Sequence, residues 1–184
     1  MNAEIIAIGS ELLTPFRQDT NSLYLTEKLN QLGVEVVLKT IVGDSRERLV
    51  SVAQHALLRS DIAIFMGGLG PTEDDLTREA VAEALGVVLY RDEEVLTRLK
   101  ERFASRGYKM TPNNYKQADV ITGAIVLPNP NGTAPGQWTI SEEASDSRFT
   151  TWPNMLRPTT MRWIWLVPST ICPSFASRYR CSTG

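Results

Sequence analysis

Cysteine and histidine are scarce in this chain of 184 residues, which holds two cysteines and one histidine. Cys172 and Cys181 are too few for a four-cysteine metal site and say little about the redox compartment. The single histidine, His55, has no cysteine or histidine partner at the spacing of metal ligands. We therefore expect a structural or exposed role for His55, and a hydrolase built on Ser-His-Asp is excluded.

Long apolar runs and a strong net charge are also missing. No run approaches the roughly 18 apolar residues that a helix needs to cross a bilayer. No basic segment precedes the first apolar run, so residues 1–10 indicate a first strand rather than a signal peptide. The formal net charge of −2 gives no general attraction to polyanions. We expect a cytoplasmic protein that binds neither membranes nor nucleic acid.

Short apolar runs alternate with amphipathic stretches over the first 138 residues. Apolar runs at residues 5–8, 34–42 and 62–66 predict strands. Apolar residues at helical spacing predict four helices. The first ends near Gly33, the second begins near Asp44, the third ends near Gly86, and the fourth spans residues 92–105. This alternation predicts an α/β fold with a parallel sheet covered on both faces.

The composition changes after Trp138. All four tryptophans and both cysteines lie from residue 138 onward, and no lysine follows Lys116. The tail shows no sustained strand or helix period, and a short strand at residues 163–167 has little support. An unusual extension and a coding frame that slipped near position 139 both explain the change, and the second is favoured. We assign residues 1–138 to one domain, incomplete at its C-terminal end. Residues 139–184 form an atypical tail, either frame-shifted or disordered.

The segment at residues 67–75, Gly-Gly-Leu-Gly-Pro-Thr-Glu-Asp-Asp, lies between the third apolar run and a predicted helix. In an open α/β sheet, ligands bind outside the C-terminal ends of the strands. Glycines let backbone N–H groups approach an anion, and the N-terminus of the next helix adds to the attraction. We therefore predict that Gly67, Gly68, Gly70 and Thr72 bind phosphate.

Two carboxylates in this segment, Asp74 and Asp75, would repel that phosphate unless a cation lies between them. A divalent ion such as Mg²⁺ binds one or two carboxylates together with phosphate oxygens and water. The segment thus predicts metal-assisted chemistry at a phosphate or pyrophosphate, with Asp75 and Asp74 as catalytic residues. The plainer alternative stays open, because Thr72 with Asp75 three residues later is also a helix-capping pattern.

Familiar phosphate-binding and pyrophosphatase motifs are absent. No Gly-Lys-Ser/Thr follows the glycines as in a P-loop, and Glu73 stands where a dinucleotide fingerprint has its third glycine. The chain also lacks the glutamate-rich helix of Nudix pyrophosphatases. Any cleavage of a pyrophosphate would therefore use a different scaffold.

Residues 67–80, Gly-Gly-Leu-Gly-Pro-Thr-Glu-Asp-Asp-Leu-Thr-Arg-Glu-Ala, closely resemble the signature of the CinA proteins. More distantly they resemble the molybdopterin-binding domain of MogA, MoaB and gephyrin. The aspartate of that wider pattern corresponds to Asp75, and Thr77, Glu79 and Ala80 complete it. Six further segments in the same order support the CinA resemblance: residues 3–14, 19–21, 42–44, 111–114, 116–118 and 132–136.

The resemblance implies a three-layer α/β sandwich with a mostly parallel sheet, as in MogA and MoaB. It also implies a nucleotide pyrophosphatase that acts on substrates such as ADP-ribose or FAD, requires a divalent metal and forms a homo-oligomer. The family's Leu-Pro-Gly-Pro-Pro loop, expected after residues 132–136, is absent from this chain. Two alternatives stay open: a molybdopterin-binding or adenylyl-transferring protein of molybdenum cofactor biosynthesis, and an inactive truncated fragment.

Other polar residues have both a possible ligand role and a plainer one. Asp19 and Asn21 fit a helix cap, and Asp44 with Glu47 fits a capping pair. The asparagines, Lys116 and Thr133 fit turns or solvated positions equally well. With the resemblance, we predict Asp44 as a second metal ligand beside Asp75. The predicted nucleotide ligands outside the glycine-rich segment are Glu11, Asp19, Asn21, Asn113, Asn114, Lys116 and Thr133.

Overall fold

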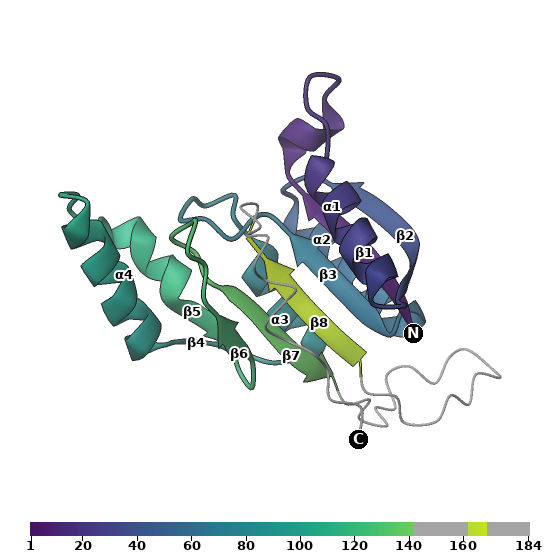
Figure 1. The fold of residues 1–184 in the computed structure, drawn as a ribbon. Helices are drawn as coiled ribbons and strands as arrows, with labels where there is room; N and C mark the ends of the chain where they lie inside the picture. Colours follow the sequence, from purple (N-terminus) through teal and green to yellow (C-terminus); the bar gives the residue numbers. More distant parts are fainter. Residues whose placement is uncertain (142–161, 169–184) are drawn as a thin grey trace.

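The computed structural model describes residues 1–141 and 162–168. Strands and helices alternate along most of this length (Figure 1). In chain order the elements are β1 (Asn2–Ile8), the 3₁₀ helix η1 (Ser10–Leu13), α1 (Thr20–Gln31), β2 (Glu35–Val42), α2 (Arg46–Arg59), β3 (Ile62–Met66), α3 (Thr77–Leu85), β4 (Leu89–Arg91), α4 (Glu93–Ser105), the 3₁₀ helix η2 (Pro112–Ala118), β5 (Asp119–Ile121), β6 (Ile125–Leu127), β7 (Gly136–Ser141) and β8 (Arg162–Val167).

Six strands form the central sheet, in the order β2-β1-β3-β8-β7-β6. Strands β2, β1, β3 and β8 run parallel, whereas β7 is antiparallel to both β8 and β6. Strands β4 and β5 form a separate antiparallel pair, which lies beside the sheet with α4 (Figure 1). The predicted fold class, a mixed α/β fold with a mostly parallel sheet, is confirmed.

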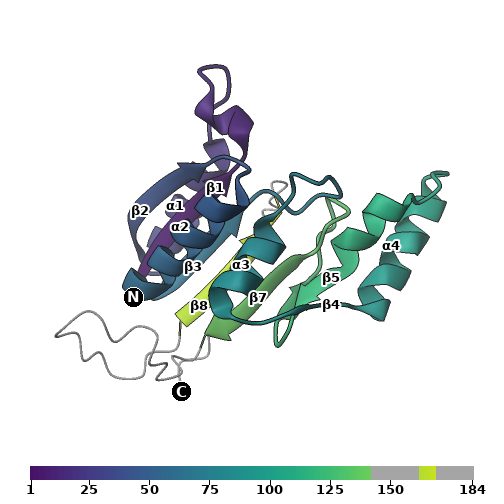
Figure 2. The same ribbon diagram turned by 180° about the vertical axis from the view of Figure 1, so that it is seen from behind.

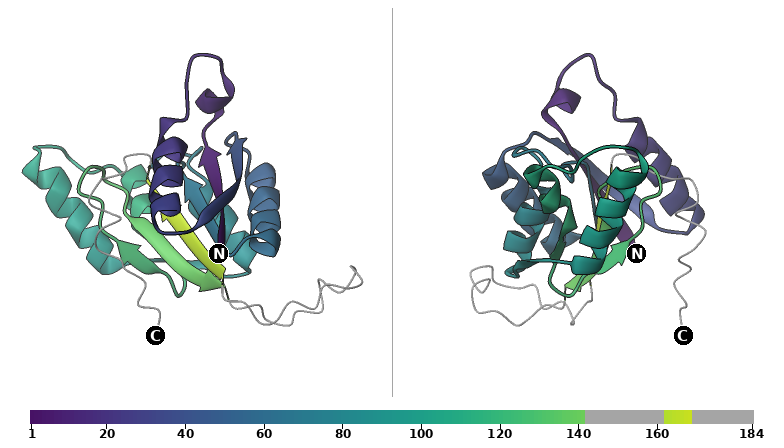
Figure 3. Two further views of the ribbon diagram at one scale, coloured as in Figure 1. Left: turned by 45° about the vertical axis from the view of Figure 1, so that its right-hand side comes forward. Right: turned by 90° about the vertical axis from the view of Figure 1, so that its left-hand side faces the viewer.

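The two faces of the sheet carry different helices. Helix α1 lies on one face, and α2 and α3 lie on the other (Figure 2); Figure 3 shows these layers from the side. The main core lies between the sheet and the pair α2 and α3, and it includes Ile6, Phe65 and Val81. A smaller apolar cluster packs under α1 around Ile64 and Leu25. No helix of the described residues is long and apolar enough to cross a membrane.

The predicted strands at residues 5–8 and 62–66 correspond to β1 and β3, which are parallel neighbours inside the sheet. Every residue of β3, and every residue of β1 after Asn2, is buried, as expected for parallel strands covered on both faces. Helix α3 ends at Gly86, which adopts a left-handed conformation (φ 69°), as predicted. Helix α4 begins after Asp92, whose carboxylate accepts from the N–H groups of Glu94 and Val95, so this boundary is also confirmed.

The predicted cap at Asp44 is wrong. Helix α2 begins after Ser45, and no side chain caps it. The Asp44 carboxylate instead accepts a 2.8 Å hydrogen bond from Ser10 N–H, and Asp44 N–H donates to Ser10 Oγ. Asp44 therefore joins the loop after β1 to the loop after β2. Asp19 caps α1 as predicted, because its carboxylate accepts from Ser22 N–H at 3.0 Å.

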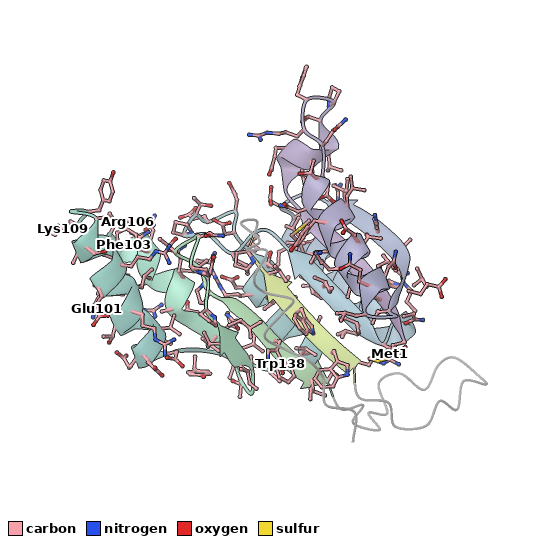
Figure 4. All side chains as sticks on the ribbon, in the orientation of Figure 1. Met1, Glu101, Phe103, Arg106, Lys109 and Trp138 are labelled. Atoms are coloured by element: carbon pink, nitrogen blue, oxygen red, sulfur yellow. The ribbon has the colours of Figure 1, made fainter. Side chains whose placement is uncertain are left out.

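Strand β8 had the least support in the sequence, yet it lies inside the sheet between β3 and β7. Its alternate residues Ile164 and Leu166 join the main core. On the other face lies Trp138 of β7, which is labelled in Figure 4. Its ring packs against those of Trp163 and Trp165, with centroid distances of 5.2 and 6.5 Å, respectively. The domain boundary at residue 138 and the frame slip stay predictions, because most of residues 139–184 lie outside the description.

Candidate functional site

The glycine-rich segment forms a loop between the C-terminal end of β3 and the start of α3. Gly67 and Gly68 have positive φ angles of 101° and 61°. A Cβ on Gly67 would lie 2.4 Å from Ile8 O, and a Cβ on Gly68 would lie 2.2 Å from Thr77 Oγ1. Only glycine therefore fits at these two positions, where the loop passes against the end of β1.

Four consecutive carbonyl oxygens of this loop accept hydrogen bonds from the start of α3. Thr77 donates its hydroxyl to Gly67 O at 2.8 Å and its N–H to Gly68 O at 3.2 Å. Arg78 donates Nη1–H to Leu69 O at 2.8 Å and Nη2–H to Gly70 O at 3.0 Å. Among the described residues, the N–H groups of Gly68 and Leu69 make no hydrogen bond. The loop thus has two neighbouring donors without a partner in this part of the chain, as in backbone sites that bind anions.

The Asp75 carboxylate lies against the same loop. It accepts hydrogen bonds from the Thr72 hydroxyl and from Thr72 N–H, the latter at 2.9 Å. A Cβ on Gly70 would lie 2.5 Å from Asp75 Oδ2. Burial acts to raise the pKa of the Asp75 carboxyl, but hydrogen bonds from Thr72 and from Gly70 N–H outweigh it, so the pKa lies below its ordinary value.

These bonds close the loop and do not cap the helix. Helix α3 begins at Thr77, its N-cap residue is Leu76, and no side chain caps it. The capping interpretation therefore predicts the contact between Thr72 and Asp75 correctly, but this contact does not cap helix α3. Asp74, the other predicted catalytic residue, is exposed next to Asp75.

Two cationic side chains approach the loop from different elements. Arg78 of α3 is fully buried, and burial lowers the pKa of its guanidinium despite the nearby carboxylates of Glu79, Asp119 and Asp75. Lys116 of η2 places Nζ 3.1 Å from Glu79 Oε1 and 3.2 Å from Thr72 O. The structure therefore brings the predicted phosphate ligand Lys116 to the glycine-rich loop.

Buried polar atoms without a hydrogen-bond partner gather around these residues. Among the described residues four such atoms occur: Arg78 Nε, Glu79 Oε2, Gln117 Oε1 and the hydroxyl of Tyr24 on α1. The first three belong to Arg78 and Glu79, which are consecutive in α3, and to Gln117, which follows Lys116 in η2. The ion pair between Lys116 and Glu79 joins these two elements. Gln117 also donates Nε2–H to the hydroxyl of Thr133 at 2.8 Å, which connects that predicted ligand to η2.

The two asparagines of η2 differ in their contacts. The Asn114 side-chain oxygen accepts from Thr111 N–H at 2.9 Å and from the Thr111 hydroxyl at 2.8 Å, which forms a capping box. The plainer role is confirmed for this oxygen, while the amide N–H₂ group of Asn114 is not used in the box. Asn113 is exposed, and its role as a nucleotide ligand stays a prediction.

The contacts of the remaining predicted ligands lie outside the glycine-rich loop. Glu11 lies over Gly9, where a Cβ would be 2.6 Å from its carboxylate. Asp19 caps α1, Asn21 lies in its first turn, and Asp44 binds Ser10. No three acidic, histidine or cysteine side chains of the described residues gather into a metal-binding cluster. Asp44 as a partner of Asp75 at one metal ion therefore stays a prediction.

A shallow groove lies elsewhere, between β2 and α2. It shares no residue with the glycine-rich loop, so we do not place the chemistry there. Its lining consists of Thr40, Ile41, Val42, Glu47, Arg48, Ser51 and Val52.

Arg78 and Gln117 were not among the predicted site residues. For Arg78 a signal was present, because it stands three residues before Val81 and seven before Leu85 of the same helix. A charge at that spacing falls on the apolar face, where it needs partners. For Gln117 the signal was its place in the family-like segment 116–118, but spacing alone did not predict its burial or its contact with Thr133.

Comparison with known proteins assigns the chain to a family. The profile of the family described as a probable molybdopterin binding domain matches residues 4–155. The chain belongs to this family. A CinA-like protein of Koribacter versatilis is 62% identical over 149 residues, which are 81% of this chain and 36% of that protein. A putative competence-damage inducible protein of Lysinibacillus sphaericus is 48% identical over 136 residues, 74% of this chain and 32% of that protein.

Solved structures agree with this assignment. The crystal structure of CinA from Thermoplasma acidophilum has a TM-score of 0.73 at 28% identity and covers 91% of this chain and 88% of that chain. MoaB from Pyrococcus furiosus has a TM-score of 0.53 at 15% identity, with 92% and 82% covered, and shows the fold alone. The resemblance to CinA is confirmed. The chain spans about a third of the length of the curated relatives it matches.

Proposed function

We propose that this domain is a nucleotide pyrophosphatase that hydrolyses a dinucleotide pyrophosphate such as ADP-ribose or FAD. The observation that supports this most is the loop after β3, whose carbonyl oxygens are held by Thr77 and Arg78 while the N–H groups of Gly68 and Leu69 stay open. Open N–H groups beside a buried guanidinium and Lys116 favour an anion with several oxygens. A pyrophosphate fits that description.

The residues present fit a divalent ion that the substrate helps to bind. Asp75 and Asp74 supply carboxylates at the edge of the loop, and Mg²⁺ binds one or two carboxylates plus phosphate oxygens and water. Such an ion, when bound, would polarise a phosphoryl oxygen. Asp75 would have to turn from Thr72 to reach it, and Asp44 would have to leave Ser10 N–H.

The chain's own residues would orient the substrate. The N–H groups of Gly68 and Leu69 would hold phosphate oxygens, and Lys116 would exchange part of its contact with Glu79 for one to phosphate. Asn113 and the amide N–H₂ group of Asn114 would contact the nucleoside. The roles of Glu11, Asp19, Asn21 and Thr133 as further ligands rest on the family resemblance.

The decisive experiment measures release of AMP from ADP-ribose in the presence of Mg²⁺ or Mn²⁺. We expect Asp75→Asn to lower kcat by at least about 100-fold, as removal of one key electrostatic group does in other enzymes. Asp92→Asn is the matched control, because asparagine caps a helix as well as aspartate. Full metal-dependent turnover in the Asp75→Asn protein would rule out the assignment.

A second function is molybdopterin binding or adenylyl transfer, favoured by the family description and by the MoaB fold. The loop after β3 does not separate the two functions, because both need an anion site. Incubation with ADP-ribose and, separately, with molybdopterin does separate them. Retention of molybdopterin without AMP release would favour the second function.

A third possibility is that this chain is inactive, because it lacks the Leu-Pro-Gly-Pro-Pro loop that the family resemblance implies. Thermal unfolding of this chain can be compared with a version extended to the length of a relative. Equal cooperativity and stability would argue against truncation. Light scattering of both versions would test the proposed homo-oligomer.

A further inference from the structure

The guanidinium of Arg78 occupies an unusual position. It is fully buried on α3, and no carboxylate of the described residues pairs with it within salt-bridge distance. Instead it binds two backbone carbonyl oxygens, and its Nε has no partner. A buried charge is costly unless its polar atoms are paired, and here one of them, Nε, has no hydrogen-bond partner among the described residues. The charge therefore calls for another explanation.

We infer that Arg78 is a positioning residue that holds the loop after β3 in its anion-binding conformation. The inference rests on the proposed function of that loop. Arg78 acts through the peptide groups of the loop, and it is not assigned a contact with substrate.

The geometry of the peptide group explains how this works. A trans peptide is planar, and its C=O and N–H point in opposite directions. Thr77 holds Gly67 O and Gly68 O, so the N–H groups of Gly68 and Leu69 point away from α3. Arg78 holds Leu69 O, so Gly70 N–H points the same way, toward the Asp75 carboxylate. Without Arg78, the last of these three donors is no longer fixed.

The second bond of Arg78 extends this effect along the loop. Nη2–H donates to Gly70 O. The nitrogen of this peptide group belongs to Pro71, so the group has no N–H. The next donor is Thr72 N–H, which meets the same Asp75 carboxylate. The positive charge of Arg78 also attracts an anion to the loop, and the nearby carboxylates of Glu79, Asp119 and Asp75 offset part of this attraction.

Arg102 provides a matched control. On α4 it donates Nη1–H to Asn129 O at 2.8 Å and Nη2–H to Pro130 O at 2.6 Å. It therefore makes the same two-carbonyl contact with a different loop, at residues the proposed function does not use. A generic loss of an arginine–carbonyl contact should affect both sites alike.

The experiment uses the full chain as Arg78→Met, Arg78→Lys and Arg102→Met variants. Calorimetry measures binding of inorganic pyrophosphate with Mg²⁺, amide hydrogen exchange follows Gly70 and Thr72, and steady-state kinetics use ADP-ribose. We expect Arg78→Met to weaken pyrophosphate binding at least tenfold and to speed exchange at both amides at least tenfold. KM for ADP-ribose should rise at least tenfold with kcat within threefold. Arg78→Lys, which keeps the charge, should show about a third of these effects, and Arg102→Met none.

Pyrophosphate affinity and amide exchange at wild-type levels in a folded Arg78→Met protein would overturn the inference. If that protein does not fold, Arg78→Lys decides in its place, and wild-type values there overturn the inference equally. Absence of pyrophosphate binding by the wild type would overturn the proposed function alone. The exchange rates at Gly70 and Thr72 would then still show whether Arg78 positions the loop.

Discussion

Buried polar groups differ between the two ends of strands β1 and β3: they are paired at the N-terminal end, whereas several described ones at the C-terminal end are not. At the N-terminal end, Glu4 is fully buried and accepts from Arg59 Nε–H at 2.8 Å and from the Ser60 hydroxyl. Asn2 N–H donates to Asp61 Oδ2, and Asp61 N–H donates to Asn2 Oδ1, each at 2.8 Å. Every one of these groups has a partner that is itself part of the fold.

At the C-terminal end, some partners are missing among the described residues. In this part of the chain, Arg78 Nε, Glu79 Oε2 and Gln117 Oε1 are buried without a hydrogen bond, and the N–H groups of Gly68 and Leu69 make none. A buried polar group left unpaired costs about 1–3 kcal/mol. The N-terminal end is therefore arranged for stability, and in the proposed function a ligand would supply the missing partners at the C-terminal end.

The sharpest test of this contrast removes a partner at the N-terminal end. Arg59→Met leaves the fully buried Glu4 carboxylate without its cation. We expect the free energy of unfolding to fall by about 3 kcal/mol, the low end for a broken buried pair, because Arg59 itself is half exposed. Urea denaturation followed by circular dichroism measures this, and kcat/KM for ADP-ribose should stay unchanged at a temperature where the variant is folded.

The double variant Glu4→Met with Arg59→Met is the control. It removes the charge along with its partner, and stability should return to within about 1 kcal/mol of the wild type. If the double variant is as unstable as Arg59→Met, the loss reflects packing rather than an unpaired charge. The N-terminal end would then lose its role in the comparison.

At the C-terminal end, the largest expected effect on stability depends on pH. The pKa of Asp75 in the folded chain lies below its ordinary value, because hydrogen bonds from Thr72 and Gly70 outweigh burial. Asp75 therefore stabilises the fold above its unfolded pKa, and this contribution disappears as the pH falls through the folded pKa. We expect Asp75→Asn to lose about 1.5 kcal/mol at pH 7, and this loss should shrink as the pH falls below the ordinary pKa of an aspartate. A loss that does not change with pH would contradict the ionised-carboxylate interpretation.

The next test concerns Lys116, which joins η2 to the loop. Lys116→Gln leaves Glu79, whose Oε2 already lacks a partner, without its ion pair. We expect a stability loss of about 1 kcal/mol, because both side chains are only partly buried. KM for ADP-ribose should rise by about tenfold, equivalent to 1.4 kcal/mol of binding. Lys100→Gln, an exposed lysine of α4, is the control and should leave both quantities unchanged.

The parts of the fold that the sequence predicts are those set by local pattern. Strands β1 and β3 are nearly continuous apolar runs because parallel strands are buried on both faces. The end of α3 at Gly86 follows from the backbone freedom of glycine. Strand β8 was poorly supported because its partly buried tryptophans, Trp163 and Trp165, pack against Trp138 of the neighbouring strand β7. Its other neighbour, β3, lies about a hundred residues earlier in the chain.

The candidate site likewise combines features that the local sequence pattern predicts with contacts that it does not predict. The glycine-rich loop was predictable because glycine, proline and aspartate follow a strand. The contact of Lys116 with Glu79 links η2 to α3, and the contact of Asp44 with Ser10 spans 34 residues. Local spacing contains no information on such contacts. It therefore assigned Asp44 to a helix cap and missed Gln117.

The smallest expected effect separates the two asparagines of η2. Asn114→Ala removes the acceptor of the Thr111 N–H and hydroxyl, so we expect a stability loss of about 0.5–1 kcal/mol, typical of a lost cap. Asn113→Ala is the matched neighbour, exposed and outside the capping box, and its stability should change by less than about 0.5 kcal/mol. KM for ADP-ribose tests the other role, since Asn113→Ala should raise it if this residue contacts the nucleoside. A rise in KM for Asn114→Ala alone, in proportion to its loss of stability, would limit η2 to positioning Lys116 and remove Asn113 from the site.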